Sequence, residues 1–178
     1  MKVLGLVGSP RKNSNTDLLV TEVLKGAAKK GHITEKVHLY SLKIDPCVDC
    51  KACKQGSFNC GLTDDMKQLY PKLEAADVIV FGTPLYWYGS SAKMKLLQDR
   101  LRPYIASKRL RGKKAVLMVP SEEGADACNH IVGIFNLSFK YLEVELVNVL
   151  LPKASERAEI KKQPNVLKEA YLIGKHLK

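Results

Sequence analysis

Residues 2–31, KVLGLVGSPRKNSNTDLLVTEVLKGAAKKG, decide the fold class of this chain. The first part, residues 2–8, is apolar, contains β-branched valines and ends in glycine, as expected of a strand that is buried on both faces. Residues 16–31 place apolar side chains at helical spacing, and the closing KKG marks a helix end. The stretch therefore predicts a strand, a polar loop and a helix in succession, which is the opening unit of an α/β fold.

The same alternation continues through the chain. Further apolar strands are expected at residues 33–40, 77–84, 112–120 and 144–152. Further helices are expected from Thr63 or Asp64 onward, and at residues 91–105, 124–143 and 163–178. Pro71 makes the middle of the second helix doubtful, because proline removes a backbone hydrogen bond. Five apolar strands that alternate with helices predict an α/β fold with a five-stranded parallel sheet and helices on both faces.

The composition is that of a globular protein, with 46% apolar and 26% charged residues. No apolar run approaches the roughly 18 residues that a membrane-spanning helix needs. The run at residues 2–8 is too short for the apolar core of a signal peptide. We therefore expect a cytoplasmic protein with no membrane partner, folded as one domain over residues 1–178 with a cysteine-rich loop at 45–62.

A polar loop, residues 8–16, lies where the first strand runs into the first helix. Ligands of open parallel sheets bind outside the carboxyl ends of strands, and a helix N-terminus offers free N–H groups to a phosphate. The candidate phosphate-binding residues are Ser9, Arg11, Asn13, Ser14, Asn15 and Thr16. The loop lacks the motifs of P-loop and dinucleotide-binding proteins, so we expect one terminal phosphate, as in FMN. A plain polar turn with a helix cap is the alternative.

An aromatic segment, GTPLYWYGSSAKMK at residues 82–95, follows the third predicted strand. Three aromatic side chains beside a glycine would suit a flat isoalloxazine ring, which needs apolar faces and close backbone approach. A surface or dimer-contact aromatic cluster is the alternative. The turn PSEEG at 120–124 would form the other wall through Ser121 and Gly124, unless it is only a polar turn.

Four of the five cysteines form the pattern C-x2-C-x2-C-x6-C, at Cys47, Cys50, Cys53 and Cys60. In a reducing compartment such a cluster indicates metal rather than disulfides. A tight C-x2-C-x2-C loop presents three thiolates to an iron–sulfur cubane, and Cys60 would supply the fourth. Zinc, which prefers two separated pairs, and no metal at all remain alternatives. The fifth, Cys128, lies in a helical pattern and is expected to be a small buried residue.

These motifs resemble the flavodoxin-like NADPH-dependent FMN reductases and, within them, the iron–sulfur flavoproteins. The resemblance rests on GSPRKNSNT, CVDCKACKQGSFNC, TPLYWYGSSAKMK and the C-terminal stretch EIKKQPNVLKEAYLIGKHLK. It implies a flavodoxin-like fold, noncovalent FMN, a [4Fe–4S] cluster and a homo-oligomer, either a dimer or a tetramer. It also implies that the ring contacts fall on Thr83, Pro84, Leu85, Tyr86, Trp87, Tyr88 and Gly89.

The expected function is that of an FMN-dependent oxidoreductase that passes electrons between a [4Fe–4S] cluster and FMN. The cofactors carry this chemistry, so no catalytic side chain is assigned. The formal charge of +11 gives either a solvated basic surface or an attraction for NAD(P)H and for an acidic electron-transfer protein such as ferredoxin. No nucleic-acid motif is present, so nucleic acid is not an expected partner. The alternatives are a cluster-free NAD(P)H-dependent FMN or quinone reductase and a flavodoxin-like electron shuttle.

Overall fold

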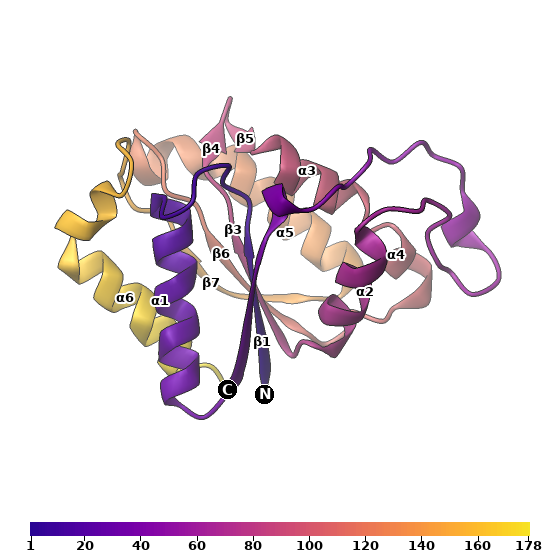
Figure 1. Ribbon diagram of the computed structural model, residues 1–178, viewed down its shortest axis with the longest axis horizontal. Coiled ribbons are helices and arrows are strands. Elements are labelled where there is room, and N and C mark those ends of the chain that lie inside the picture. The colour runs from indigo at the N-terminus through magenta and orange to yellow at the C-terminus, as the bar shows by residue number, and fades with distance from the viewer.

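Five parallel strands form the central sheet in the order β2-β1-β3-β6-β7 (Figure 1). The computed structural model describes all residues from Met1 to Lys178. The strands are β1 (Lys2–Val7), β2 (Ile33–His38), β3 (Val78–Gly82), β6 (Lys114–Met118) and β7 (Glu145–Leu150). The predicted five-stranded parallel sheet is therefore confirmed, and its strand order reverses between β1 and β3, where ligands of such sheets bind.

Helices cover both faces of the sheet, as predicted (Figure 1). One face carries α1 (Asn15–Lys29) and α6 (Pro164–Lys175), which pack on Val3 and Val7 of β1 and on valines of the neighbouring strands. The other face carries α2 (Met66–Ala75), α3 (Ala92–Asp99), α4 (Pro103–Ser107) and α5 (Asn129–Leu142). Leu4 and Leu6 point to this second face. Alternate residues of β1 thus enter two separate cores, as the period of a strand requires.

Two predicted helices were wrong in extent. The helix expected at 91–105 is two helices, because α3 ends at its C-cap residue Arg100 and Pro103 occupies the first turn of α4. The helix expected at 124–143 begins as a 3-10 helix, Gly124–Cys128, and becomes α5 only at Asn129.

The helix that was expected from Thr63 or Asp64 begins at Met66. Pro71 lies inside it and removes one backbone hydrogen bond. Leu69 and Leu73 are buried against the sheet on the same helix, so tertiary packing holds α2 despite the proline.

The cysteine loop, residues 45–62, leaves the body of the molecule at the far edge from α1 and α6 (Figure 1). Its regular structure is one 3-10 helix, Ala52–Lys54. Two hydrogen bonds close the neck of the loop, where its two ends meet. Asp65 N donates to Lys43 O at 3.0 Å, and Asp45 N donates to Asp64 Oδ2 at 2.9 Å.

None of the helices combines the length and the apolar character that are needed to cross a bilayer.

Candidate functional site

One pocket lies outside the carboxyl ends of the central strands. It has a volume of about 210 Å³ and is formed by the loops that follow β1, β3, β6 and β7. Of the residues predicted from sequence, it brings together Ser9, Arg11, Ser14, Asn15, Thr16, Pro84, Leu85, Tyr86 and Ser121. Three loops that are far apart in the sequence therefore meet where the fold predicts a ligand.

The N-terminus of α1 opens into this pocket. Ser14 caps the helix, and its Oγ accepts from Asp17 N at 3.2 Å. The Asn15 side chain donates to Glu156 O at 2.8 Å and accepts from Ile160 N at 3.1 Å. The side chains of Ser14 and Asn15 are thus used to shape the loop. The remaining donors for an anion are the free N–H groups of the first helical turn, the guanidinium of Arg11 and the hydroxyls of Ser9 and Thr16.

Asp17 is a buried acid beside this helix N-terminus. It accepts from Asn13 N at 2.8 Å and from Lys36 Nζ at 2.8 Å. Burial alone would raise the pKa of Asp17, but the bonds from Lys36 and Asn13 and the nearby His38 outweigh it and hold the pKa below its usual value. Asn13 has a φ of 55°, so Asp17 fixes a left-handed residue of the loop. Asn13 does not line the pocket, and its contribution is the left-handed bend that it gives to the lining loop.

A hairpin that was not predicted carries the aromatic segment. It consists of β4 (Leu85–Tyr86) and β5 (Gly89–Ser90), which pair in antiparallel fashion. Trp87 and Tyr88 form its two-residue turn with φ of 49° and 59°. Such turns normally use Asn-Gly, because bulky residues are strained at positive φ. Strain of this kind is typical of binding sites.

The Trp87 side chain is 97% exposed at the tip of the hairpin. Trp87, Tyr88 and Gly89 do not line the strand-end pocket, whereas Tyr86 of the same hairpin does. The hairpin thus places Tyr86 in the pocket wall and leaves the neighbouring Trp87 exposed to solvent.

Two buried side chains join the hairpin to the first loop. Ser91 Oγ donates to Gly8 O at 2.5 Å, and Ser91 N donates to Thr83 Oγ1 at 3.0 Å. Thr83 and Ser91 are both fully buried. Thr83, predicted as a ring contact, is therefore placed behind the pocket wall, where it fixes the spacing between the two loops.

The turn after β6 and the segment after β7 complete the pocket. Gly124 lies outside the lining, but its carbonyl accepts from Ser121 Oγ at 3.0 Å. Pro120 and Glu122, in the turn expected to form the other wall, also line the pocket. The sequence analysis missed the segment after β7, which contributes Ala154, Ser155, Glu156 and Arg157. Arg157 ties this segment to the first loop, since its Nη2 donates to Lys12 O at 3.0 Å. The position of this segment could have indicated its role, because PKASER at residues 152–157 follows the last parallel strand, where ligands of such sheets bind.

The cysteine loop is held to the body by three arginines. Arg100 donates to Asp45 O at 2.8 Å and pairs with Asp64, while Arg102 pairs with Asp49 at 2.5 Å. Arg109 donates to Ser57 O at 2.9 Å and to Asn59 Oδ1 at 3.0 Å. The loop is thus anchored at three places along its length, near Asp45, at Asp49 and at Ser57–Asn59.

All four loop cysteines line one small pocket, together with Arg100 and Arg102. Cys53 is buried, Cys60 is half-buried, and Cys47 and Cys50 are exposed. Burial raises the pKa of the Cys53 thiol, and Arg102 opposes that effect. The side chains are not drawn close enough to hold a single ion, since no three His, Cys, Asp or Glu residues form such a group. Cys128 is fully buried, as predicted, and burial raises its pKa.

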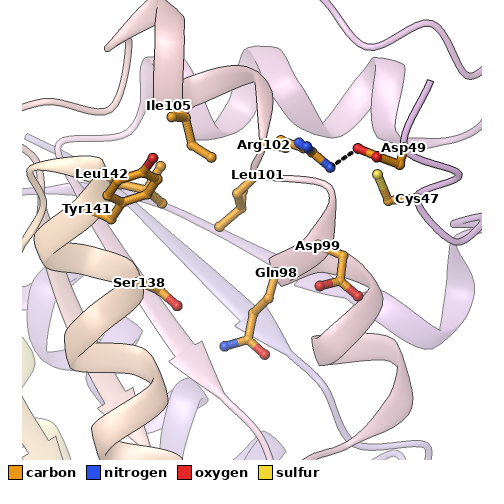
Figure 2. A pocket seen from close by; sticks show the side chains of 10 residues that line it. All are labelled: Cys47, Asp49, Gln98, Asp99, Leu101, Arg102, Ile105, Ser138, Tyr141 and Leu142. Atoms are coloured by element: carbon orange, nitrogen blue, oxygen red, sulfur yellow. Dashed lines mark ion pairs between the residues drawn. The ribbon is translucent and has the colours of Figure 1, made fainter. Parts of the chain in front are cut away.

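A larger cavity, of about 510 Å³, adjoins the cysteine loop between α3, α4 and α5 (Figure 2). Cys47 and the Asp49–Arg102 pair border it on one side, and Tyr141 faces them across an apolar floor of Leu101 and Ile105. Although this cavity is larger, it lacks the helix N-terminus and the convergent strand ends that suit the strand-end pocket to an anionic ligand.

Comparison with known proteins gives the family. The sequence model of the family described as NADPH-dependent FMN reductase matches residues 1–156. An iron–sulfur flavoprotein of Archaeoglobus fulgidus is 33% identical over 151 residues, which cover 83% of this chain and 74% of that protein. One of Methanocaldococcus jannaschii is 42% identical over 113 residues, which cover 64% of this chain and 58% of that protein. For three such relatives the match spans only 51–58% of their length.

Solved structures agree on the fold. The NAD(P)H:quinone oxidoreductase from Methanothermobacter marburgensis superimposes with a TM-score of 0.77 at 20% identity, over 100% of this chain and 99% of that one. The family match and the flavodoxin-like strand order lead to one conclusion: the chain belongs to the NADPH-dependent FMN reductase family.

Proposed function

We propose that this protein is an FMN-dependent oxidoreductase that accepts electrons from NAD(P)H or a reduced ferredoxin and exchanges them between FMN and a [4Fe–4S] cluster. The observation that carries the proposal is the meeting of the β1, β3, β6 and β7 loops in one pocket at the α1 N-terminus. Relatives named iron–sulfur flavoproteins and a relative named as an NAD(P)H-dependent FMN-containing oxidoreductase support it.

The residues of the strand-end pocket fit FMN. The first helical turn of α1, with Arg11 and the hydroxyls of Ser9 and Thr16, offers donors to a terminal phosphate. The hairpin of Tyr86 and Trp87 would cover one face of a flat ring, and Pro120 and Ser121 would form the opposite wall. Bound FMN would supply hydride and single-electron chemistry, and the chain's own role is to orient the ring and exclude water from it.

The cysteine pocket fits an iron–sulfur group better than zinc. Its four thiols are the softest donors in a lining that also contains Asp49 and Asp99. They share the pocket with Arg100, whose charge would offset the charge of bound thiolates. Four ligands of one zinc ion must converge at a Zn–S distance of about 2.3 Å. The thiolates of a cubane bind four different irons and lie farther apart, which agrees with cysteines that share a pocket without meeting at one point.

We also propose a homo-oligomer. Three apolar side chains on α5 are exposed without a partner in the chain: Ile134, Leu137 and Tyr141. They share one helix face at spacings of three and four residues, which is the arrangement expected of a helix that packs against another subunit. Light scattering after gel filtration tests this, with a mass of at least twice that of the chain expected.

The experiment that tests the proposed function is anaerobic purification followed by flavin and iron analysis. We expect about one FMN and about four iron atoms per chain, and flavin bleaching on addition of NADPH or reduced ferredoxin. A protein that contains neither flavin nor iron, and that takes up neither on reconstitution, would contradict the proposal.

A cluster-free NAD(P)H-dependent FMN or quinone reductase is the second candidate. It is favoured by a relative from Bacillus subtilis, 31% identical over 100 residues, whose name mentions NAD(P)H and FMN but no iron–sulfur group. Comparison of the wild type with Cys50→Ser decides between the two. If FMN is bound and NADPH oxidation with a quinone is equal in both proteins, and no iron is present, the cluster-free reductase is correct.

A further inference from the structure

Arg100 has one buried side-chain nitrogen that makes no hydrogen bond. Its Nη1 donates to Asp45 O at 2.8 Å and to Asp64 Oδ2, and its Nη2 donates to Asp64 Oδ1 at 3.0 Å. The Arg100 Nε atom is buried and has no partner. A buried donor without an acceptor costs about 1–3 kcal/mol, so such groups are rare in native proteins and require an explanation.

The position of Arg100 supplies that explanation. The residue lines the pocket that is also lined by Cys47, Cys50, Cys53 and Cys60. Its side chain is only 1% exposed, so bulk water does not satisfy the free N–H. The chain therefore supplies no acceptor for this N–H, and the cysteine pocket is the space beside Arg100 in which a bound group could supply one.

We propose that Arg100 donates its Nε–H to a sulfur atom of the iron–sulfur group held by the four loop cysteines, and thereby raises the reduction potential of that group. The inference rests on the proposed function, because it requires the cluster. An N–H···S bond and a nearby cation stabilise the reduced state, which carries one more negative charge than the oxidised state. Arg100 acts through the cluster sulfur and is a positioning and tuning residue.

The geometry suits such a role because Arg100 is fixed from three sides. Its backbone N–H caps α3 with bonds to Leu96 O and Leu97 O, and its carbonyl accepts from Tyr70 Oη at 2.8 Å. Asp64 holds the end of the guanidinium. A donor that is held in this way needs little reorganisation when the charge of the cluster changes.

Arg102 is the natural control. It lines the same pocket and carries the same charge, but its side chain is 31% exposed and pairs with the 58% exposed Asp49 (Figure 2). A solvated cation shifts a nearby redox potential much less than a buried one. Arg102→Lys therefore controls for the exchange of an arginine for a lysine at this pocket without the loss of a buried N–H donor.

The test compares Arg100→Lys with Arg102→Lys. Lysine keeps a cation opposite Asp64 but lacks the Nε–H. Each reconstituted protein is analysed for iron and sulfide, and its midpoint potential is measured in an anaerobic titration followed by electron paramagnetic resonance. We expect wild-type iron in both variants, a lower potential in Arg100→Lys and an unchanged potential in Arg102→Lys.

The outcomes distinguish a failure of the Arg100 inference from a failure of the proposed cluster. Iron-loaded Arg100→Lys with the wild-type potential overturns the inference and leaves the proposed cluster of the wild type standing. A folded Arg100→Lys that has lost its iron also overturns the inference, because Arg100 would then hold the cluster rather than tune its potential. Wild-type protein that takes up no iron overturns the proposed cluster and the inference with it.

A second measurement does not depend on the folding of Arg100→Lys. The Arg102→Lys protein is labelled with 15N-arginine and its cluster is reduced. We expect a hyperfine coupling from arginine nitrogen in pulsed electron paramagnetic resonance. Its absence overturns the inference.

Discussion

Arg100 and Asp64 form a two-bond ion pair whose side chains are 1% and 0% exposed. The pair joins the end of α3 to the neck of the cysteine loop. Asp64 also accepts from the backbone N–H groups of Asp45 and Met66. Burial alone would raise the pKa of Asp64, but the Arg100 guanidinium and these N–H groups hold it below its usual value. The carboxylate therefore fixes both ends of the loop at once.

Asp64→Ala is expected to lower the free energy of unfolding by about 3–5 kcal/mol, because it leaves the Arg100 charge buried without a partner. Asp99→Ala is the control, since Asp99 belongs to an exposed pair with Lys95 and its loss should change stability by less than about 1 kcal/mol. Urea unfolding of both variants measures the difference. Equal effects would contradict the structural role of the buried pair.

Two glycines allow α1 and α6 to touch. A Cβ at Gly26 would lie 1.9 Å from Tyr171 O, and one at Gly174 would lie 1.8 Å from Val23 O. Gly26→Ala is expected to cost about 1–3 kcal/mol through overpacking. Gly133→Ala in α5 has open space and should instead gain about 0.5–1 kcal/mol. Thermal unfolding should show a lower melting temperature for Gly26→Ala and a higher one for Gly133→Ala. Two shifts of the same sign would argue against the close packing of α1 on α6.

Replacement of Trp87 by glycine in the turn of the β4–β5 hairpin should raise the stability of the fold and weaken FMN binding. Trp87→Gly removes a bulky residue from positive φ and is expected to raise the free energy of unfolding by up to about 1 kcal/mol. The same change should weaken FMN binding by about 2- to 10-fold, because a ring face is lost. Trp87→Ala keeps the backbone strain and should show only the loss of binding. FMN affinity that is unchanged in both variants would remove the hairpin from the flavin site.

Asp17 should make stability depend on pH in the acidic range. Its pKa is lower in the folded chain than the ordinary value of 3.8 for an aspartate. A carboxylate with a lowered pKa stabilises the fold above its unfolded pKa, and the stabilisation is lost as the pH falls through the folded pKa. Asp17→Asn should thus cost about 2 kcal/mol at pH 7 and progressively less below about pH 3.8. Urea unfolding of both proteins over this range is the measurement, and a difference that is independent of pH would refute the assignment.

Much of the fold could be predicted because local signals agree with it. The apolar strands, the helical spacing of Leu19 and Val23, and the polar loop after β1 all point to the same α/β order. The ends of helices were less predictable. Arg100 and Asn129 mark breaks in stretches that were each expected to be one helix. Pro103 is a local signal for the first break, whereas no proline marks the second.

The candidate site was predictable where it follows strand ends and unpredictable where it depends on distant pairs. Ser9, Arg11 and Thr16, which the sequence suggested as phosphate ligands, line the strand-end pocket. Asp64 and Arg100 are 36 residues apart and each resembles an ordinary surface charge in its own segment, so only the fold reveals their burial. The Trp87–Tyr88 turn was hidden for a related reason: its sequence lacks the Asn-Gly signal that normally marks such a hairpin.

Binding of FMN and of riboflavin to the flavin-free protein tests the central claim most directly, since riboflavin has the ring without the phosphate. We expect the wild type to bind FMN more tightly than riboflavin. Arg11→Ala should weaken FMN binding by about 10- to 100-fold and leave riboflavin binding unchanged, because one charged donor to the phosphate is lost. Equal affinities of the wild type for the two flavins would contradict a phosphate site at the N-terminus of α1.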